Sequence, residues 1–240
     1  VTIPSSVTSI GDCAFGFCSG LTSVTIPSGV TSIGEGAFSG CSGLTSVTIP
    51  SSVTIIGVEA FADCGSLTAI SVEAKNSAYC SVDGILYNKS KTELLQCPGG
   101  KSGAMTIPSS VTSIEDGAFE GCSNLTFVSI PSSVTSIGEW AFSECNGLTS
   151  VSIPSSVTNI GRSAFYYCNK MMSVMIPSSV TGIGDEAFRV CDKLKTVYVS
   201  AGDAERVSSL YSFSKSVAFV ELDELDVPTY WGDWYVDAWN

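Results

Sequence analysis

The feature that most constrains this chain is a sequence period of 23 residues. The unit V-T-I-P-S-S-V-T-S-I-G-x-x-A-F-x-x-C-x-x-L-x-x begins at Val1 and recurs from residues 24, 47, 105, 128, 151 and 174. Seven of the nine prolines hold its fourth position, and seven of the ten cysteines hold its eighteenth. Periods between roughly 20 and 50 residues are typical of solenoids and other repeat architectures. We call these units coils 1 to 7 in chain order.

Each unit predicts one turn of a coil. The run Leu21–Pro27 has the L-x-x-V-x-I spacing of leucine-rich repeats, and its apolar residues alternate as in a strand that proline ends. A second short extended segment, 30–33, is expected to end at Gly34 with a positive φ. Glu115 replaces that glycine in coil 4, so this corner is expected to differ. The segment Glu35–Cys41 predicts a single helical or 3₁₀ turn.

A single coil cannot be stable alone. Burying its large apolar side chains contributes roughly 1.5–3 kcal/mol each, whereas ordering the backbone costs about 1–2 kcal/mol for every residue. Stacking lets each coil cover its neighbours, with like positions ~4.8 Å apart and right-handed connections. The predicted fold class is therefore an α/β-type repeat solenoid: a right-handed, leucine-rich-repeat-like coil with a parallel β-sheet, second short strands and short helical or 3₁₀ turns.

The period is interrupted once and fades at the end, which sets the predicted domain organisation. We expect one solenoid over 1–222, in which residues 70–104 form a longer variant coil with a hairpin turn at Asp83-Gly84 and a strand before Pro98. A separate small domain is the alternative for 70–104. Residues 197–222 are expected to form a C-terminal cap, with a helix from Ala204 to Ser212 and a strand from Val217 to Leu222.

The tail, 223–240, holds three of the four Trp residues and several acids. Its rings are expected to pack on the cap or on an outer face of the solenoid. An aromatic and acidic docking patch for carbohydrate or protein is the alternative, and a linker or disordered end is a third.

The unit, joined to the motif Y-x-S-x-D-G-x-L-Y at Tyr79–Tyr87, resembles the BspA-like leucine-rich-repeat family over residues 1–222. This resemblance implies a curved, right-handed solenoid on bacterial or protist cell surfaces. It also implies adhesion to host matrix proteins, coaggregation with other cells and recognition by innate receptors. The family has no shared catalytic residues, and the tail lies outside the resemblance.

The residues argue against enzymatic chemistry. The chain has no histidine, which removes Ser-His-Asp and Cys-His nucleophiles and histidine-containing zinc sites. The repeated cysteines are 23 residues apart rather than in C-x-x-C pairs, so they predict a column of reduced, buried thiols. Cys13, Cys80 and Cys97 lie off this ladder; Cys13 is expected to be partly exposed, and Cys80 and Cys97 could pair. We expect no catalytic residue, no cofactor and no metal site.

Two surface patterns remain as candidate sites. Acids recur at the twelfth position of the unit, where a calcium site or a basic partner is the alternative to a solvated, helix-capping edge. On the strands, the outward positions carry mostly small hydroxyl side chains, and a few large residues stand out there. The partner-binding candidates are Phe127, Met175, Tyr198, Thr106, Ser129 and Ser152.

These features predict a non-catalytic protein-binding module of a cell-surface or secreted, adhesin-type protein. The expected partner is a host matrix protein, a receptor or a microbial surface protein. A net charge of −12 with 11 Lys and Arg argues against nucleic acid, and no apolar run is long enough for a membrane helix. The chain opens inside a repeat unit without a signal-peptide pattern, as expected of a processed or truncated piece. The alternative function is a structural spacer or stalk with no ligand of its own.

Overall fold

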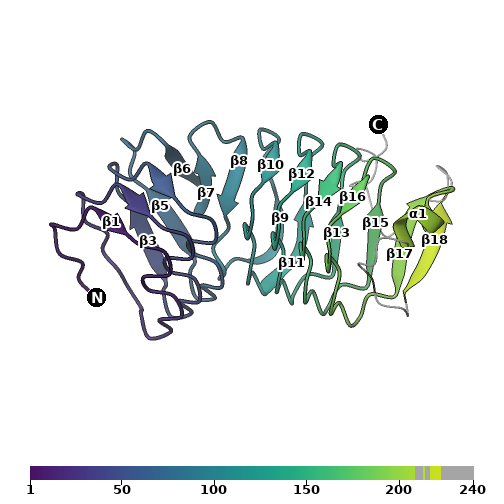
Figure 1. The fold of residues 1–240 in the computed structure, drawn as a ribbon, viewed down its shortest axis with the longest axis horizontal. Helices are drawn as coiled ribbons and strands as arrows, with labels where there is room; N and C mark the ends of the chain where they lie inside the picture. Colours follow the sequence, from purple (N-terminus) through teal and green to yellow (C-terminus); the bar gives the residue numbers. More distant parts are fainter. Residues whose placement is uncertain (209–212, 214–216, 223–240) are drawn as a thin grey trace.

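A computed structural model describes residues 1–208, 213 and 217–222. The coils are stacked side by side in chain order and give an elongated molecule with the first coil at one end and the cap at the other (Figure 1). The structure is a β-solenoid built from short parallel strands, and its one described helix is five residues long.

One side of the solenoid is built from the L-x-x-V-x-I segments. These strands form three parallel sheets along the axis: β3 (Ser46–Ile49) with β5 (Ala69–Val72); β9 (Ser102–Thr106), β11 (Asn124–Ser129) and β13 (Ser150–Ser152); and β15 (Ser173–Ile176), β17 (Thr196–Ser200) and β18 (Ala218–Leu222). Coils 1 and 2 meet here through a single bridge, Thr2 with Thr25. The predicted alternation holds in β3, where Val47 and Ile49 are buried while Thr48 is exposed.

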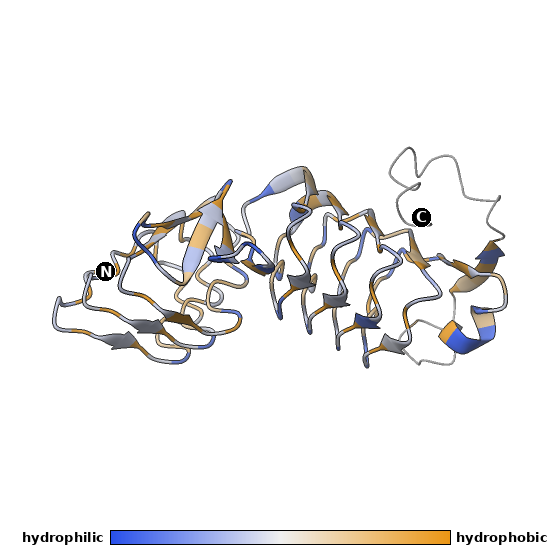
Figure 2. Cartoon of the chain, turned by 90° about the horizontal axis from the view of Figure 1, so that it is seen from above, coloured by the Kyte–Doolittle hydropathy of each residue, from blue (hydrophilic) through white to orange (hydrophobic). Residues whose placement is uncertain are grey.

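The second side carries the two-residue strands of the S-I segments. They are β1 (Ser9–Ile10), β2 (Ser32–Ile33) and β4 (Ile55–Ile56) in one sheet, and β10 (Ser113–Ile114), β12 (Ser136–Ile137), β14 (Asn159–Ile160) and β16 (Gly182–Ile183) in another. Their register follows the repeat, since Ser9 pairs with Ser32 and Ile114 pairs with Ile137. Seen from above, apolar and polar segments alternate along each coil (Figure 2), as expected when one strand face lies inward.

The third side differs from the prediction, because the expected helical turn is absent from the described coils. In coil 1, the Ala14 amide donates to the Gly11 carbonyl and the Cys18 amide donates to the Phe15 carbonyl. The residues before each of these donors, Cys13 and Phe17, have φ of 52° and 57°. A positive φ at the third residue of a four-residue turn is the pattern of a type II turn. A continuous helix requires negative φ throughout, so the chain turns twice instead.

The repeated glycine at the eleventh position has a different role from the predicted one. Gly34 is absent from the residues with positive φ, whereas a Cβ atom on it would lie 2.6 Å from the Asp12 amide nitrogen of the preceding coil. A Cβ atom on Gly161 would lie at the same distance, 2.6 Å, from the Glu139 amide nitrogen of the preceding coil. The glycine is therefore required because successive backbones approach closely.

The core is a set of columns that run along the axis. Phe38 stacks on Phe61 with ring centroids 5.4 Å apart, and Phe119 stacks on Phe142 at 4.6 Å. These ring distances are close to the expected spacing of neighbouring strands, ~4.8 Å. The prediction that equivalent residues of successive coils stack in columns is therefore confirmed. The cysteine column lies beside them: the Cys145 thiol donates to the Phe119 carbonyl of the preceding coil at 3.1 Å. All ten cysteines are free thiols, and Cys13 is exposed as predicted.

The variant coil contains the predicted hairpin. Strand β6 (Tyr79–Val82) pairs antiparallel with β7 (Ile85–Asn88), and Asp83 and Gly84 both have positive φ, as a type I′ turn requires. Strand β8 (Glu93–Gln96) follows and pairs with both β7 and β10. Cys97 lies off the cysteine column, as predicted, because it takes the hydrogen-bonding place of the column phenylalanine: its amide donates to the Ala118 carbonyl of coil 4. It is buried, and the Cys122 thiol donates to its carbonyl at 3.7 Å.

The core divides into two clusters at the variant coil. One cluster runs from Ile3 to Ile70 and includes Leu86, and the other runs from Ile85 and Tyr87 to Val207. Alternate residues of β7 thus face different cores, which makes this strand a partition between coils 1–3 and coils 4–7.

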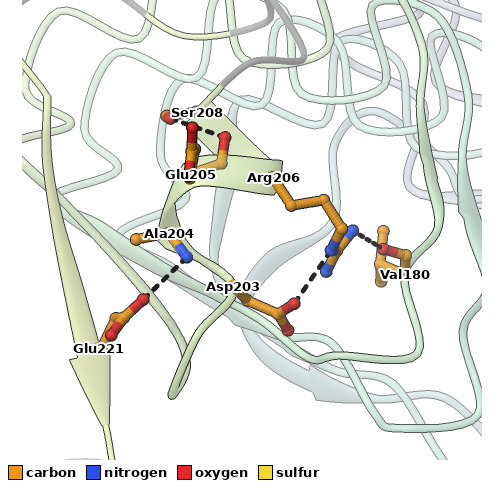
Figure 3. Close-up of polar contacts among 7 residues, drawn as sticks. All are labelled: Val180, Asp203, Ala204, Glu205, Arg206, Ser208 and Glu221. Carbon is orange, nitrogen blue, oxygen red and sulfur yellow. Dashed lines mark hydrogen bonds and ion pairs between the residues drawn. The ribbon is translucent and has the colours of Figure 1, made fainter.

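The last coils end in a compact segment. Helix α1 (Ala204–Ser208) begins at the predicted residue, and the expected continuation over 209–212 lies outside the described residues. Arg206 connects the helix to coil 7 by donating to the Val180 carbonyl at 2.7 Å and pairing with Asp203 (Figure 3). The Ala204 amide donates to Glu221 of β18. The regular 23-residue repeat therefore ends after coil 7, and helix α1 and strand β18 follow it.

Candidate binding surfaces

Four of the six predicted partner-binding residues lie together on the sheet β9–β11–β13. Thr106, Ser129 and Ser152 are aligned in one register row across its three strands. Phe127 lies two residues before Ser129 on the same strand face and is partly exposed. Its register partners are Ala104 and Ser150, both small. This arrangement places one large aromatic side chain beside a row of hydroxyl groups.

The other two candidates lie on the neighbouring sheet and are not alike. Tyr198 is partly exposed, whereas Met175 is only 4% exposed, so the prediction that it faces solvent was wrong. Met175 pairs in register with Tyr198, and these two large side chains are next to each other on one face of the sheet. A flexible methionine packs readily against such a neighbour, which leaves Tyr198 as the candidate on this sheet.

The acidic column at the twelfth position connects successive coils. The Asp12 carboxylate accepts a hydrogen bond from the Glu35 amide at 2.9 Å, and Asp116 accepts from the Glu139 amide at 2.7 Å. Each donor belongs to the following coil. No group of three or more Cys, Asp or Glu side chains in the described part of the chain is placed to hold a metal ion. Asp12 and Asp116 therefore act as connections between successive coils.

The turns of coils 5 and 6 form an aromatic cluster that the sequence analysis did not identify. Trp140 meets Tyr166 edge to face at 5.8 Å, and Tyr166 lies 6.0 Å from Tyr167. The Arg162 guanidinium lies over the Trp140 ring at 5.9 Å from its centroid, within the range of a cation–π contact. These residues occupy different positions of the unit, so no single column of the repeat displays them.

Two of these rings project from residues with strained backbone. Trp140 and Tyr167 have φ of 56° and 61°, at positions where coil 4 has Gly117 and Gly121. Bulky residues in this region cost roughly 1–2 kcal/mol each relative to relaxed geometry. The same two positions of the other coils also have positive φ, so the strain belongs to the turn of the repeat. The grouping of three aromatic rings with Arg162 is what makes this cluster a second candidate surface.

A cavity of about 280 Å³ lies where coil 3 meets the variant coil and coil 4. We call this junction the seam. Its wall is partly apolar, and Val58, Phe61 and Leu95 contribute to it. Three carboxylates also line it: Glu93, Glu115 and Asp116. Glu115 is the residue that breaks the glycine column, and the Ser113 hydroxyl donates to its carboxylate at 2.6 Å.

Backbone hydrogen bonding changes at the seam. In regular coils the phenylalanine amide donates to the alanine carbonyl of the next coil, as Phe38 does to Ala60 and Phe142 does to Ala164. Cys97 instead of Phe61 donates to the Ala118 carbonyl, at 2.6 Å. Over the described residues the Phe61 amide has no such inter-coil acceptor. One direct turn-side bond remains between coils 3 and 4, from the Asp63 amide to the Glu120 carbonyl at 3.4 Å. The ladder is therefore interrupted at Phe61, where the cavity lies, and is not broken throughout.

Carboxyl groups crowd the turn side of the seam. Burial, followed by the charges of Asp63, Glu59 and Glu144, raises the pKa of Glu120 to about 8. Burial is also the main cause of the raised pKa values of Glu59 and Asp63. In the described part of the chain the ion pairs are Glu186–Arg189 and Asp203–Arg206, both far along the chain. The acids on the turn side thus lie close together without an ion-paired cation among the described side chains, and Glu120 keeps its proton at neutral pH.

Comparison with known proteins identifies the repeat. A family model described as the BspA type leucine rich repeat region matches six copies, over residues 1–92 and 101–218. A comparison with curated proteins finds no match. No helix among the described residues has the length and apolar character needed to span a membrane.

Solved structures with this fold come from several bacteria. A leucine rich cell surface protein from Faecalibacterium prausnitzii A2-165 is 32% identical over 99% of this chain and 61% of its own, with a TM-score of 0.79. The pneumococcal vaccine antigen PcpA is 25% identical over 93% of this chain and 62% of its own, with a TM-score of 0.80. A leucine-rich repeat protein from Eubacterium ventriosum is 26% identical over 92% of this chain and 72% of its own, with a TM-score of 0.70. The chain thus spans less than two thirds of the first two proteins.

Proposed function

Because the chain belongs to the BspA-type leucine-rich-repeat family, we propose that it is a non-catalytic protein-binding module of a cell-surface or secreted, adhesin-type protein. Its partner would be a host matrix protein, a receptor or a microbial surface protein. The similar proteins include one described as a cell surface protein and one described as a vaccine antigen. These descriptions support an extracellular location.

The observation that carries this proposal is the sheet β9–β11–β13. It presents Phe127 among small neighbours, next to the row of Thr106, Ser129 and Ser152. Aromatic side chains are enriched at protein interfaces, and a few of them contribute most of the binding energy. Small hydroxyl side chains around such an anchor allow a partner to approach closely. Tyr198, on β17, is a second anchor for a partner that spans several coils.

The test is a surface plasmon resonance screen of the immobilised chain against matrix proteins and microbial surface proteins. We expect at least one saturable interaction, and we expect Phe127→Ala or Tyr198→Ala to weaken it tenfold or more without changing the unfolding temperature. Phe17→Ala is the matched control, because Phe17 is 81% exposed on the turn side of coil 1. A flat screen, or equal losses in all three variants, would contradict the proposal.

The second candidate function is a structural spacer without a ligand. The regular phenylalanine and cysteine columns within each array favour it, since coils stacked with such regular contacts form a rigid rod. The same screen separates the two functions, because a spacer gives no saturable binding.

A further inference from the structure

The seam has a form that no regular coil shares. Its cavity lies between two turns of the solenoid, where the inter-coil ladder is interrupted at Phe61. Tyr79 of β6 partly bridges the gap, because its hydroxyl accepts a hydrogen bond from the Ile56 amide at 2.9 Å. The volume of about 280 Å³ is at the lower limit for small-molecule sites. It has room for one long side chain and is too small for a bulky ligand.

The wall of the cavity offers apolar contact along one part and negative charge along another. Phe61 and Leu86 are buried within the wall, and Val58 is 47% exposed at its edge. Glu93 is an exposed carboxylate, and Glu115 is partly exposed. A long side chain with an aliphatic stem and a charged end matches such a wall, since its stem covers apolar surface while its end stays near water.

The charge of the surroundings selects the sign of the ligand. None of the lining residues is Lys or Arg. The regular coils around the seam, residues 1–69 and 105–150, also contain no Lys or Arg, while they contain nine Asp and Glu residues. The variant coil, 70–104, contains four Lys and three Asp and Glu residues, and none of these lysines lines the cavity. A cation entering the cavity therefore meets three acidic side chains in its lining and no basic one.

We infer that the seam cavity binds a long cationic side chain, an arginine or a lysine, presented by the partner protein. Arginine fits best, because its planar guanidinium can share hydrogen bonds between carboxylates such as those of Glu93 and Glu115. Its methylene groups would lie against Val58 and Leu95. This inference rests on the proposed function for the source of the side chain, and the cavity defines the chemistry of that side chain.

The experiment uses two peptides that differ only in charge. Acetyl-Gly-Gly-Arg-Gly-Gly-amide carries the guanidinium, and its citrulline counterpart replaces it with a neutral urea of the same shape. Each is titrated into the ¹⁵N-labelled chain while the backbone amide signals are followed by NMR. We expect the arginine peptide to give saturable shifts at Tyr79, Leu95 and Glu115, and the citrulline peptide to bind at least tenfold more weakly.

Two variants test the location. The double variant Glu93→Gln, Glu115→Gln removes two carboxylates that no described backbone amide depends on, and it should weaken arginine-peptide binding at least tenfold. Glu139→Gln is the matched control, because it removes an exposed acid at the Asp116 position one coil further on. It should leave the affinity unchanged. Equal binding of the two peptides, equal loss in both variants, or no saturable shift would overturn the inference.

The outcomes also separate this inference from the proposed function. A protein partner that binds the double variant as tightly as the original chain would sink the inference and leave the proposed function intact. Specific binding of the arginine peptide at the seam, with no protein partner found in the surface plasmon resonance screen, would contradict the proposed function and leave the inference about the cavity intact.

Discussion

Coils 1–3 and coils 4–7 are built from the same unit, and yet they belong to separate cores. The first core contains 20 buried residues and ends at Ile70 and Leu86, while the second contains 38 and reaches Val207. Both stack their phenylalanine rings at nearly the same spacing, 5.1 Å for Phe15–Phe38 and for Phe142–Phe165. The repeat sequence thus predicts ring stacking between successive regular coils, and it does not predict contact across the variant coil. Whether the two arrays act as one body depends on the variant coil between them.

The two regions also differ in charge and in their ends. Coils 1–3 contain no Lys or Arg, whereas coils 6 and 7 contain Arg162, Lys170, Arg189, Lys193 and Lys195. Arg206 fastens the segment after coil 7 to Val180. The second region is therefore larger, electrically more balanced and better connected at its end. In a chain whose stability is the sum of neighbour contacts, we expect it to be the more stable of the two.

The largest expected effect comes from removing one ring in each core. Phe38→Ala and Phe142→Ala should each cost about 3–5 kcal/mol locally, because each leaves a cavity in a packed column. Phe38→Ala should open coils 1–3 while coils 4–7 stay folded. Phe142→Ala should lower the denaturant concentration at which coils 4–7 open. Pulse proteolysis across a guanidinium series, with fragments identified by mass spectrometry, reports which region has opened. Equal loss in both regions for either variant would show that the seam does not divide the molecule.

The second effect is at the seam and depends on pH. Below about pH 4.5 the Glu120 carboxyl is protonated in both the folded and the unfolded chain. Between pH 4.5 and 8 the folded chain keeps a proton that the unfolded chain has released, so stability falls as pH rises. Glu120→Gln should reduce this fall, to which the raised pKa values of Glu59 and Asp63 also contribute, and raise stability at pH 8 by roughly 1–3 kcal/mol. Urea unfolding at pH 4.5 and at pH 8 measures it.

Glu139→Gln, an exposed acid of the next coil, serves as the control for this pH dependence. The explanation fails if Glu120→Gln leaves the difference between pH 4.5 and pH 8 as large as in the original chain.

The smallest effect concerns the backbone of the turns. Val190 has φ of 59°, which is strongly disfavoured for a β-branched residue. Val190→Gly should therefore stabilise coil 7 by up to about 1 kcal/mol. The converse change Gly121→Val, at the same position of coil 4 and with φ of 71°, should destabilise by more, because a Cβ there would also lie 2.8 Å from the Asp63 Cα. Differential scanning calorimetry measures both. Stabilisation by Gly121→Val would contradict the assigned turn geometry.

Much of the fold follows from the sequence because columns of identical residues have one simple spatial solution. The stacking of Phe38 on Phe61, the alternation in β3 and the turn at Asp83-Gly84 were all predicted from spacing and turn chemistry. The right-handed sense of the coil stays a prediction from the chirality of parallel connections. So does the division of the chain into one solenoid, a cap and a tail.

The failures have physical causes of their own. The left-handed residues of the turns were hidden because glycine at Gly36 alternates with larger residues such as Cys13 and Trp140 at the same position. Gly34 was assigned a φ when its actual constraint is the backbone of the coil before it. Contacts between unlike positions of different coils, such as Trp140 with Tyr166, cannot be read from a column alignment.

The candidate site was predicted only in part. Phe127 and its hydroxyl row follow from strand alternation and register, whereas the burial of Met175, which pairs in register with Tyr198, does not follow from strand alternation. The seam required the structure, because the length of the variant coil conceals that Cys97 takes the hydrogen-bonding place of a phenylalanine.

The most direct test of the account is amide hydrogen exchange measured residue by residue by NMR on the whole chain. The amides of Phe38 and Phe142 donate to Ala60 and Ala164 in the next coils at 2.8 Å and 2.7 Å. Both should exchange slowly, while the Phe61 amide, equally buried in its column, should exchange at least a hundredfold faster. Protection of Phe61 equal to that of Phe142 would show an unbroken ladder through the seam and contradict the division of the solenoid into two arrays.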